Sequence, residues 1–276
     1  MINTSGKKFV SLLKKWYVFI VLILIYVPLI IVVLISFNPE TDHGNINLNF
    51  GVPSIVNYLK LFTNDAFLNA LSNSLILSLI VTPISLIIGV FTCYGLWKSK
   101  AATKNFVLNI SRFSIMTPEV ITGISLVLLF SSTLIPIGFS FGFLTVVLSH
   151  ISFCAPYVII SVYPRMMKMN NNLILASYDM GYTKMRTFMK VTVPYLMPAI
   201  LTAAVIVISM SWDDFIITNL VNGSWQTLGI AIYMTRKGIK AWIITFGAIM
   251  IIVTILAIAI IAGVRAHKSK RKVIRI

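Results

Sequence analysis

The chain has 276 residues, of which 58% are apolar and only 11% carry a charge. Soluble domains average about 45–50% apolar and about 25% charged residues, so this composition indicates a protein that resides in a lipid bilayer. A net charge of +16 would favour nucleic-acid binding in a soluble protein. Because the basic residues form no stripe with interleaved aromatic residues, we expect no nucleic-acid partner.

Most of the 23 basic residues gather in four clusters. One precedes the first apolar block, one surrounds residues 98–112, one lies within residues 161–200, and one closes the chain. Basic residues beside membrane spans accumulate on the cytoplasmic side. We therefore expect a multi-pass protein of the plasma membrane with both termini inside the cell. Residues 1–15 then form a cytoplasmic segment, and residues 265–276 form a basic cytoplasmic tail.

Six apolar blocks are long enough to cross the hydrocarbon core, which requires about 20 helical residues. The first, residues 16–37, contains no charged residue. It is too long for the apolar region of a signal peptide and no small-residue cleavage site follows it, so we interpret it as a spanning helix. The other five spans are predicted at residues 70–97, 105–135, 142–162, 196–220 and 242–264. The sequence thus predicts an all-α, polytopic membrane protein with six transmembrane helices.

The segments around these spans carry weaker signals. Apolar residues share one helical face within residues 55–62, which predicts a short helix at the membrane interface. Pro83 predicts a kink in the second span, and residues 116–119 interrupt the third. Pro198 is expected near the start of the fifth span, where the missing N–H costs nothing. Residues 221–241 are expected to form an outer loop.

Residues 161–200 form the longest interruption between apolar blocks. Apolar residues recur at helical spacing on both sides of Gly181, and Pro164 and Pro194 bracket the segment. This pattern predicts two short helices joined at a glycine hinge. We expect residues 164–195 to be a cytoplasmic loop that docks with a soluble partner. Its basic residues fit electrostatic docking and also fit a purely topological role.

Sequence motifs for enzymatic chemistry are missing from the chain. No glycine-rich phosphate loop ends in Lys-Ser or Lys-Thr, so we expect no ATP binding of the P-loop type and assign nucleotide hydrolysis to another subunit. No nucleophile–base pair stands out, so we expect no enzyme and no cofactor. The two cysteines lie in apolar blocks and the histidines are scattered, so neither a disulfide nor a metal site is predicted. These residues are Cys93, Cys154, His43, His150 and His267.

Three of the seven acidic residues, Glu119, Asp213 and Asp214, lie in or near the predicted spans. A carboxylate at membrane depth is costly, and it is usually paired or lines a water-filled path. Adjacent helical residues point about 100° apart, so we expect one aspartate to face a path and the other to be paired. Trp212 can add a cation–π contact with a permeant amine. We therefore predict a cationic permeant whose path is lined by Glu119, Trp212, Asp213 and Asp214.

The sequence also allows other roles for these acidic residues and for Trp212. Glu119 can pair with Arg112, seven residues earlier on the same predicted helical face. The aspartates can cap a loop or neutralise Arg236 or Lys237. Trp212 also fits an ordinary interfacial aromatic residue. The same set of acids also fits proton coupling in a transporter.

The segment around Gly181 resembles the cytoplasmic loop of ABC importer permeases, whose pattern is Glu-Ala-Ala, three residues, Gly and a later Pro. The matching positions are Leu175-Ala176-Ser177, Asp179, Gly181, Phe188 and Pro194, with Leu175 in place of the Glu and Ser177 in place of the second Ala. Further segments resemble permeases of the spermidine/putrescine (PotC-type) family. These are residues 36–38, 57–62, 71–75, 116–130, 149–166 and 211–223.

The resemblance implies a type I ABC importer fold, with a transmembrane domain at residues 69–264 and a coupling loop at residues 164–195. It implies a polyamine importer built with a sister permease, two copies of an ATP-binding ABC subunit and an extracytoplasmic polyamine-binding protein. The implied ATPase contacts are Leu175, Ala176, Ser177, Asp179, Met180, Gly181 and Tyr182. The alternatives are an ABC permease for another small solute and a stand-alone secondary transporter of cations.

Overall fold

The structure is a computed structural model that describes residues 4–49, 51–235 and 238–273, with side chains described between residues 16 and 264. Within these ranges the chain is helical, and its extended pairings are two isolated β-bridges. Six helices are long and apolar enough to cross a membrane, which confirms the predicted all-α fold and the number of spans. The chain divides into two compact units, one made of residues up to 68 and from 235 onward, the other of residues 69–234.

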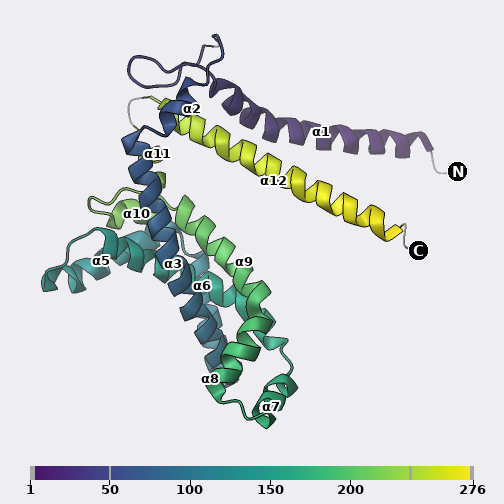
Figure 1. The fold of residues 1–276 in the computed structure, drawn as a ribbon, viewed down its shortest axis with the longest axis vertical. Helices are drawn as coiled ribbons and strands as arrows, with labels where there is room; N and C mark the ends of the chain where they lie inside the picture. The colour runs from purple at the N-terminus through teal and green to yellow at the C-terminus, as the bar shows by residue number, and fades with distance from the viewer. Residues whose placement is uncertain (1–3, 50, 236–237, 274–276) are drawn as a thin grey trace. The chain divides into compact units, whose positions relative to one another are not determined.

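Two long helices dominate the first unit, α1 (Thr4–Ile35) and α12 (Ala241–Val273). They run antiparallel and side by side (Figure 1). Both are longer than their predicted spans, because residues 4–15 and 265–273 continue the same helices. The segments expected before the first span and after the last are therefore helical where their backbone is described, while residues 1–3 and 274–276 lie outside the described residues.

A polar loop and a short helix complete the first unit. The helix predicted within residues 55–62 is α2 (Val56–Leu61). Lys60 of α2 pairs with Glu40, and the Asn57 side chain donates to the carbonyl of Asn38 over 2.6 Å. These bonds satisfy polar groups within the loop itself. Among the described residues between α1 and α3 (Asp65–Trp97), the regular structure consists of α2 and isolated β-bridges.

The second unit is organised around α6 (Phe143–Met167). Its buried face packs against α4 (Ala101–Met116), α9 (Val193–Asp213) and α10 (Ile216–Val221). The long helix α3 (Asp65–Trp97) crosses α6 at Gly89, where an added Cβ would lie 2.4 Å from Val158 Cγ1. The missing side chain therefore allows close approach of the two backbones. One buried apolar cluster joins α3, α6 and α9, with Leu77, Val158 and Leu196 fully buried.

Two predicted spans are not single helices. The predicted third span divides into α4 (Ala101–Met116), α5 (Glu119–Thr133) and a 3-10 turn, η1 (Ile135–Ile137). The predicted fifth span divides into α9 (Val193–Asp213) and α10 (Ile216–Val221). The third span is broken where residues 116–119 were expected to interrupt it, whereas the prediction of one continuous helix was wrong for the fifth span. Hydropathy alone does not register a short break whose backbone polar groups are satisfied locally.

Prolines also lie elsewhere than the sequence predicted. Pro164, expected to bracket the loop, lies inside α6, and Pro194 rather than Pro198 occupies the first turn of α9. Pro198 lies further along the same helix. Packing against neighbouring helices tolerates such internal prolines in membrane proteins. Pro83 lies inside α3, where a kink stays a prediction.

The loop at residues 164–195 contains one separate helix instead of two. This is α7 (Asn171–Asp179), which lies with α8 (Lys184–Thr187) at one end of the second unit (Figure 1). A π-helical turn, η2 (Phe188–Thr192), joins α8 directly to α9. The expected second short helix is thus the first turn of a long one. At the other side of the unit, residues 221–241 include a short helix, α11 (Leu228–Tyr233).

Candidate functional site

The first wall of the candidate site is the break between α4 and α5. Thr117 precedes Pro118 and adopts extended backbone angles (φ −71°, ψ 131°), which ends α4 at Met116. A residue before proline is disfavoured in the helical region, so the local sequence dictates this break. Glu119 is then the first residue of α5, where the partial positive charge of a helix N-terminus favours a carboxylate.

The second wall is the break between α9 and α10. Asp213 ends α9 and is exposed, whereas Asp214 adopts extended angles (φ −65°, ψ 124°) and is 8% exposed. The carboxylate of Asp214 accepts hydrogen bonds from the Thr218 amide at 2.8 Å, the Thr218 hydroxyl at 2.5 Å and the Ile217 amide at 3.3 Å. Its charge is therefore held against the first turn of α10.

The third wall is α6, which contributes Phe153 and Tyr157. The three walls enclose a cavity of about 400 Å³. It is lined by Ser114, Ile115, Thr117, Pro118, Glu119, Thr122, Phe153, Tyr157, Ser209, Met210, Asp213, Asp214 and Ile217. The fold thus brings together two helix breaks that lie almost 100 positions apart in the chain, with an aromatic face between them.

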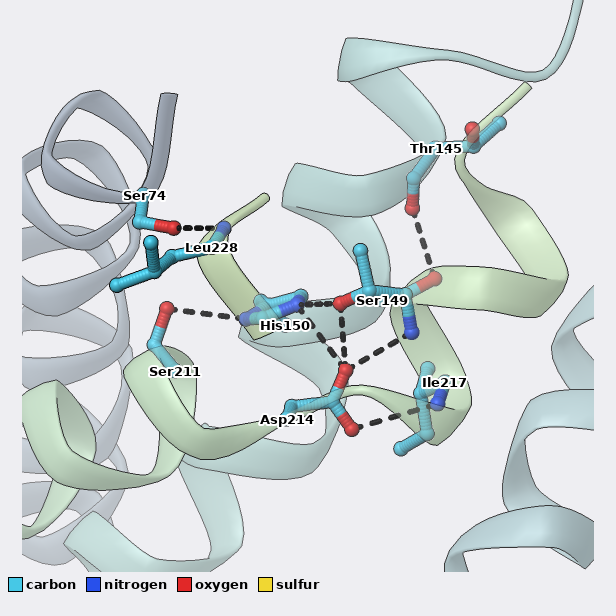
Figure 2. Close-up of polar contacts among 9 residues, drawn as sticks. Ser74, Thr145, Ser149, His150, Ser211, Asp214, Ile217 and Leu228 are labelled. Atoms are coloured by element: carbon cyan, nitrogen blue, oxygen red, sulfur yellow. Dashed lines mark hydrogen bonds and ion pairs between the residues drawn. The ribbon is translucent and has the colours of Figure 1, made fainter. Parts of the chain in front are cut away.

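Behind the cavity, α6 supplies a buried histidine that the sequence reasoning missed. His150 is completely buried, with Nδ1 3.0 Å from Ser211 Oγ and Nε2 2.8 Å from Thr218 Oγ1. Nε2 also lies 3.6 Å from Asp214 Oδ2 (Figure 2). The histidines are indeed scattered in sequence. The sequence nevertheless carries a signal for such a site, because a histidine inside an apolar span needs hydrogen-bonding partners.

The structure brings three of the four predicted path residues to one cavity. Glu119, Asp213 and Asp214 line it, whereas Trp212 is half-buried and is not part of its lining. Asp214 is paired and Asp213 is exposed, whereas a permeation path facing Asp213 stays a prediction. Within the described ranges, these carboxylates do not combine with histidine or cysteine into a cluster that could hold a metal ion.

The alternative pairings proposed for the acids have different outcomes. Pairing of Glu119 with Arg112 was wrong, because the break at Pro118 places them on different helices and Arg112 donates to Asn109 instead. Among the described residues, Glu119 and Asp213 form no ion pair. Arg236 and Lys237 lie outside the described residues.

A second candidate surface lies at α7 and the turn after it. Leu175 and Met180 are 57% and 69% exposed, and Ala176 and Asp179 are exposed as well. Gly181 has φ +81°, and the amides of Gly181 and Tyr182 donate to the carbonyls of Tyr178 and Ser177. This is a Schellman ending, which needs a residue that tolerates left-handed angles.

Two residues predicted to contact a partner are engaged inside the chain. Ser177 is 1% exposed and its hydroxyl meets that of Thr187 at 2.6 Å. Tyr182 is half-buried, and its ring lies beneath the charged groups of Arg186 and Lys190, at 5.7 and 5.9 Å from the ring centre. Of the seven residues predicted for docking, Ser177 is therefore not accessible to a partner.

Comparison with known proteins identifies the family of this chain. The profile of a family described as "Binding-protein-dependent transport system inner membrane component" matches residues 82–272. The chain belongs to this family. It is a multi-pass membrane permease rather than an enzyme, and its transport system includes a substrate-binding protein, a sister permease and a separate ATPase subunit.

Individual relatives refine the placement of this permease. It is 43% identical to the "Spermidine/putrescine transport system permease protein PotC homolog" of Mycoplasma genitalium, over 96% of this chain and 95% of that protein. It is 46% identical to the protein of the same description from Mycoplasma pneumoniae, over 94% and 93%. A bacterial ABC transporter involved in the import of the acidic polysaccharide alginate shares the fold, with a TM-score of 0.68, 13% identity and coverage of 96% and 98%.

Proposed function

We propose that this permease imports polyamines such as spermidine and putrescine, using ATP hydrolysed by its partner subunit. The observation that carries the proposal is the pair of carboxylates, Glu119 and Asp213, that line one cavity without an ion pair among the described residues. Such charges are costly in a membrane unless a cation accompanies them. The names of the two Mycoplasma relatives point to the same class of cargo.

The lining of the cavity suits an alkyl ammonium ion. Carboxylates accept short, charge-assisted hydrogen bonds from ammonium groups, and the rings of Phe153 and Tyr157 offer cation–π contacts. Hydroxyl groups of Ser114, Thr122 and Ser209 add further acceptors. A volume of about 400 Å³ accommodates a flexible chain with several ammonium groups and leaves room for water. In this proposal Trp212 supports the path from outside the lining.

The coupling surface is proposed at α7 and the following turn. Leu175, Ala176 and Met180 offer exposed apolar area, and Asp179 adds a charge at its edge. Gly181 and Tyr182 shape the turn, while Ser177 acts from inside the chain. We propose that this surface contacts one of two copies of the ATPase. Closure of the ATPase would then move α8 and α9 as one helical piece, because η2 joins them without a loop.

The orientation follows from this assignment. Residues 164–195 and both termini are proposed to be cytoplasmic, in line with the basic clusters. An extracytoplasmic polyamine-binding protein would deliver the cargo on the opposite face. The transmembrane domain is proposed at residues 69–264. A compact unit of residues 69–234 supports its start, whereas residues 235–264 belong to the other unit. With a sister permease, this chain would form half of the translocation path.

The proposal is tested with the complete complex in proteoliposomes. Uptake of radiolabelled spermidine and putrescine is measured for the native complex and for Asp213→Asn and Glu119→Gln. We expect each variant to lower the maximal uptake rate about tenfold, as for the loss of one charge-assisted hydrogen bond. Asp65→Asn, an exposed acid that is not part of the cavity lining, is the charge-matched control. A native complex that carries neither polyamine, or full uptake by both variants, would refute the proposal.

A further inference from the structure

For a neutral imidazole beside an ionised Asp214, the hydrogen bonds around His150 have one consistent direction. An ionised Asp214 accepts only, so the Thr218 hydroxyl donates its proton to Oδ2. The oxygen of Thr218 is then available as an acceptor, and Nε2 of His150 is its donor. Nδ1 is left as the acceptor for the Ser211 hydroxyl. A directed chain therefore runs from Ser211 in α9 through His150 in α6 and Thr218 in α10 to the Asp214 carboxylate. Figure 2 labels Ser211, His150 and Asp214 of this chain.

This chain connects the two ends of the break between α9 and α10. Ser211 lies just before the break and Thr218 just after it, and His150 is the side chain that contacts both. Because adjacent polar contacts are buried in a low-dielectric setting, each strengthens the next. The histidine ring thus fixes the length and angle of the break from a third helix.

Independent contacts hold the other side of the same break. An added Cβ on Gly229 would lie 2.9 Å from the Asp214 carbonyl oxygen, so the start of α11 packs directly on the break. The amide of Leu228 donates to Ser74 of α3 at 2.8 Å. Thr145 of α6 donates to the Val221 carbonyl at the end of α10 over 2.7 Å. These contacts fix the backbone around Asp214. The side chain can then change its contacts only by rotation of the carboxylate.

That rotation decides how much negative charge the cavity presents. Asp214 lines the cavity, yet its carboxylate turns to α10 and to the Thr218 hydroxyl that His150 supports. Glu119 and Asp213 are the exposed carboxylates of the same lining. A third free carboxylate would favour cargo with more positive charges, because each additional ammonium group of the cargo would then be attracted by an unpaired carboxylate.

We propose that His150 is a positioning residue of the permeation site. Acting through Thr218, it holds the Asp214 carboxylate in the wall, so that the cavity presents two free carboxylates instead of three and thereby sets its selectivity among cations. This selectivity role rests on the proposed import of polyamines. The charge presented to the cavity does not depend on the identity of the cargo and is measured separately.

The test uses a cysteine reporter in the assembled complex. Ser209→Cys places a thiol in the cavity lining, while native Cys93 and Cys154 are fully buried. The ratio of labelling rates for a cationic and an anionic thiol reagent of equal size reports the local negative charge. We expect His150→Leu to raise this ratio at least about threefold, and His150→Gln to restore it, since its amide still donates to Thr218.

Matched variants distinguish a specific effect of His150 from a general loss of structure. Ser149→Ala removes a fully buried hydroxyl one residue away that bonds only within α6, and it should leave the ratio unchanged. Thr218→Val, with Thr218→Ser as its rescue, repeats the test if His150→Leu does not assemble. A ratio that stays constant in the assembled variants, or rises equally in Ser149→Ala, overturns the proposal.

Transport then provides the second readout. In the same complexes, His150→Leu should raise the maximal uptake rate of the triamine spermidine relative to the diamine putrescine at least about threefold. A loss of folded protein lowers both rates equally and leaves their ratio unchanged. A normal uptake ratio with an altered labelling ratio would refute the selectivity role while retaining the positioning role. An altered labelling ratio in a complex that carries no polyamine would refute the proposed function alone.

Discussion

The hydroxyl groups of Ser177 and Thr187 meet at 2.6 Å, ten positions apart and on opposite sides of the left-handed turn at Gly181. Both side chains are buried, and the Ser177 hydroxyl also donates to the Ile174 carbonyl at 3.0 Å. This pair fixes α7 to α8, and α8 continues through η2 into α9. A movement imposed on α7 is thereby passed to a membrane span.

Ser177→Ala should weaken coupling without abolishing assembly. It leaves the buried Thr187 hydroxyl without its Ser177 contact, at a cost of about 1–3 kcal/mol, and it loosens α7 on α8. We expect uptake per ATP hydrolysed to fall about threefold, measured in proteoliposomes that hold the whole complex. The double variant Ser177→Ala with Thr187→Val removes both polar groups and should recover stability. Unaltered coupling in the single variant would mean that the pair does not transmit movement.

Gly181→Val should uncouple ATP hydrolysis from uptake. An added Cβ meets no atom within 4 Å, so the strain arises from the backbone angle of φ +81° alone. A left-handed conformation costs about 1–2 kcal/mol for ordinary residues and more for a β-branched one. Gly181→Asn is the control, because asparagine tolerates this region. Coupling ratios that are equal in the two variants would contradict the role of the turn.

Gly89→Ala should destabilise the second unit. The new methyl group would lie 2.4 and 2.6 Å from Cγ1 and Cβ of Val158, atoms too close to the backbone to move aside. We expect a loss of about 1–3 kcal/mol, seen as a lower midpoint temperature of thermal unfolding in detergent. Gly95→Ala, on the same helix with open space around it, is the matched control. Adding Val158→Gly, which removes both clashing atoms, should restore part of the stability, and failure to do so would exclude this clash as the cause.

The two adjacent aspartates should separate into different roles. Asp214→Asn removes a buried charge that accepts three hydrogen bonds, and we expect it to lower stability by about 1–3 kcal/mol. Asp213→Asn changes an exposed side chain and should alter stability by less than about 0.5 kcal/mol. Thermal unfolding of both variants in the assembled complex checks this difference. Equal destabilisation would argue against the division between a paired and a free carboxylate.

Much of the architecture was readable from hydropathy. A run of about 20 apolar residues has few options other than crossing a bilayer as a helix, because only a helix satisfies its own backbone there. The six spans were therefore predicted correctly in number and approximate place. The interruption of the third span at residues 116–119 was predicted, and it carries a local signal in the residue before proline. The break at Asp214 was not predicted.

The sequence by itself determined the membrane class, the number of spans and the glycine turn. It also indicated which acidic residues lie at membrane depth, where an unpaired carboxylate has a high free-energy cost. These are properties of short stretches, and their physical cause is local hydration or backbone sterics. Only the tertiary structure decided that two helix breaks share a cavity, that His150 lies behind it, and that Ser177 faces inward. Those facts depend on residues from 10 to almost 100 positions apart in the chain, and no local pattern encodes which side chains will meet when helices pack.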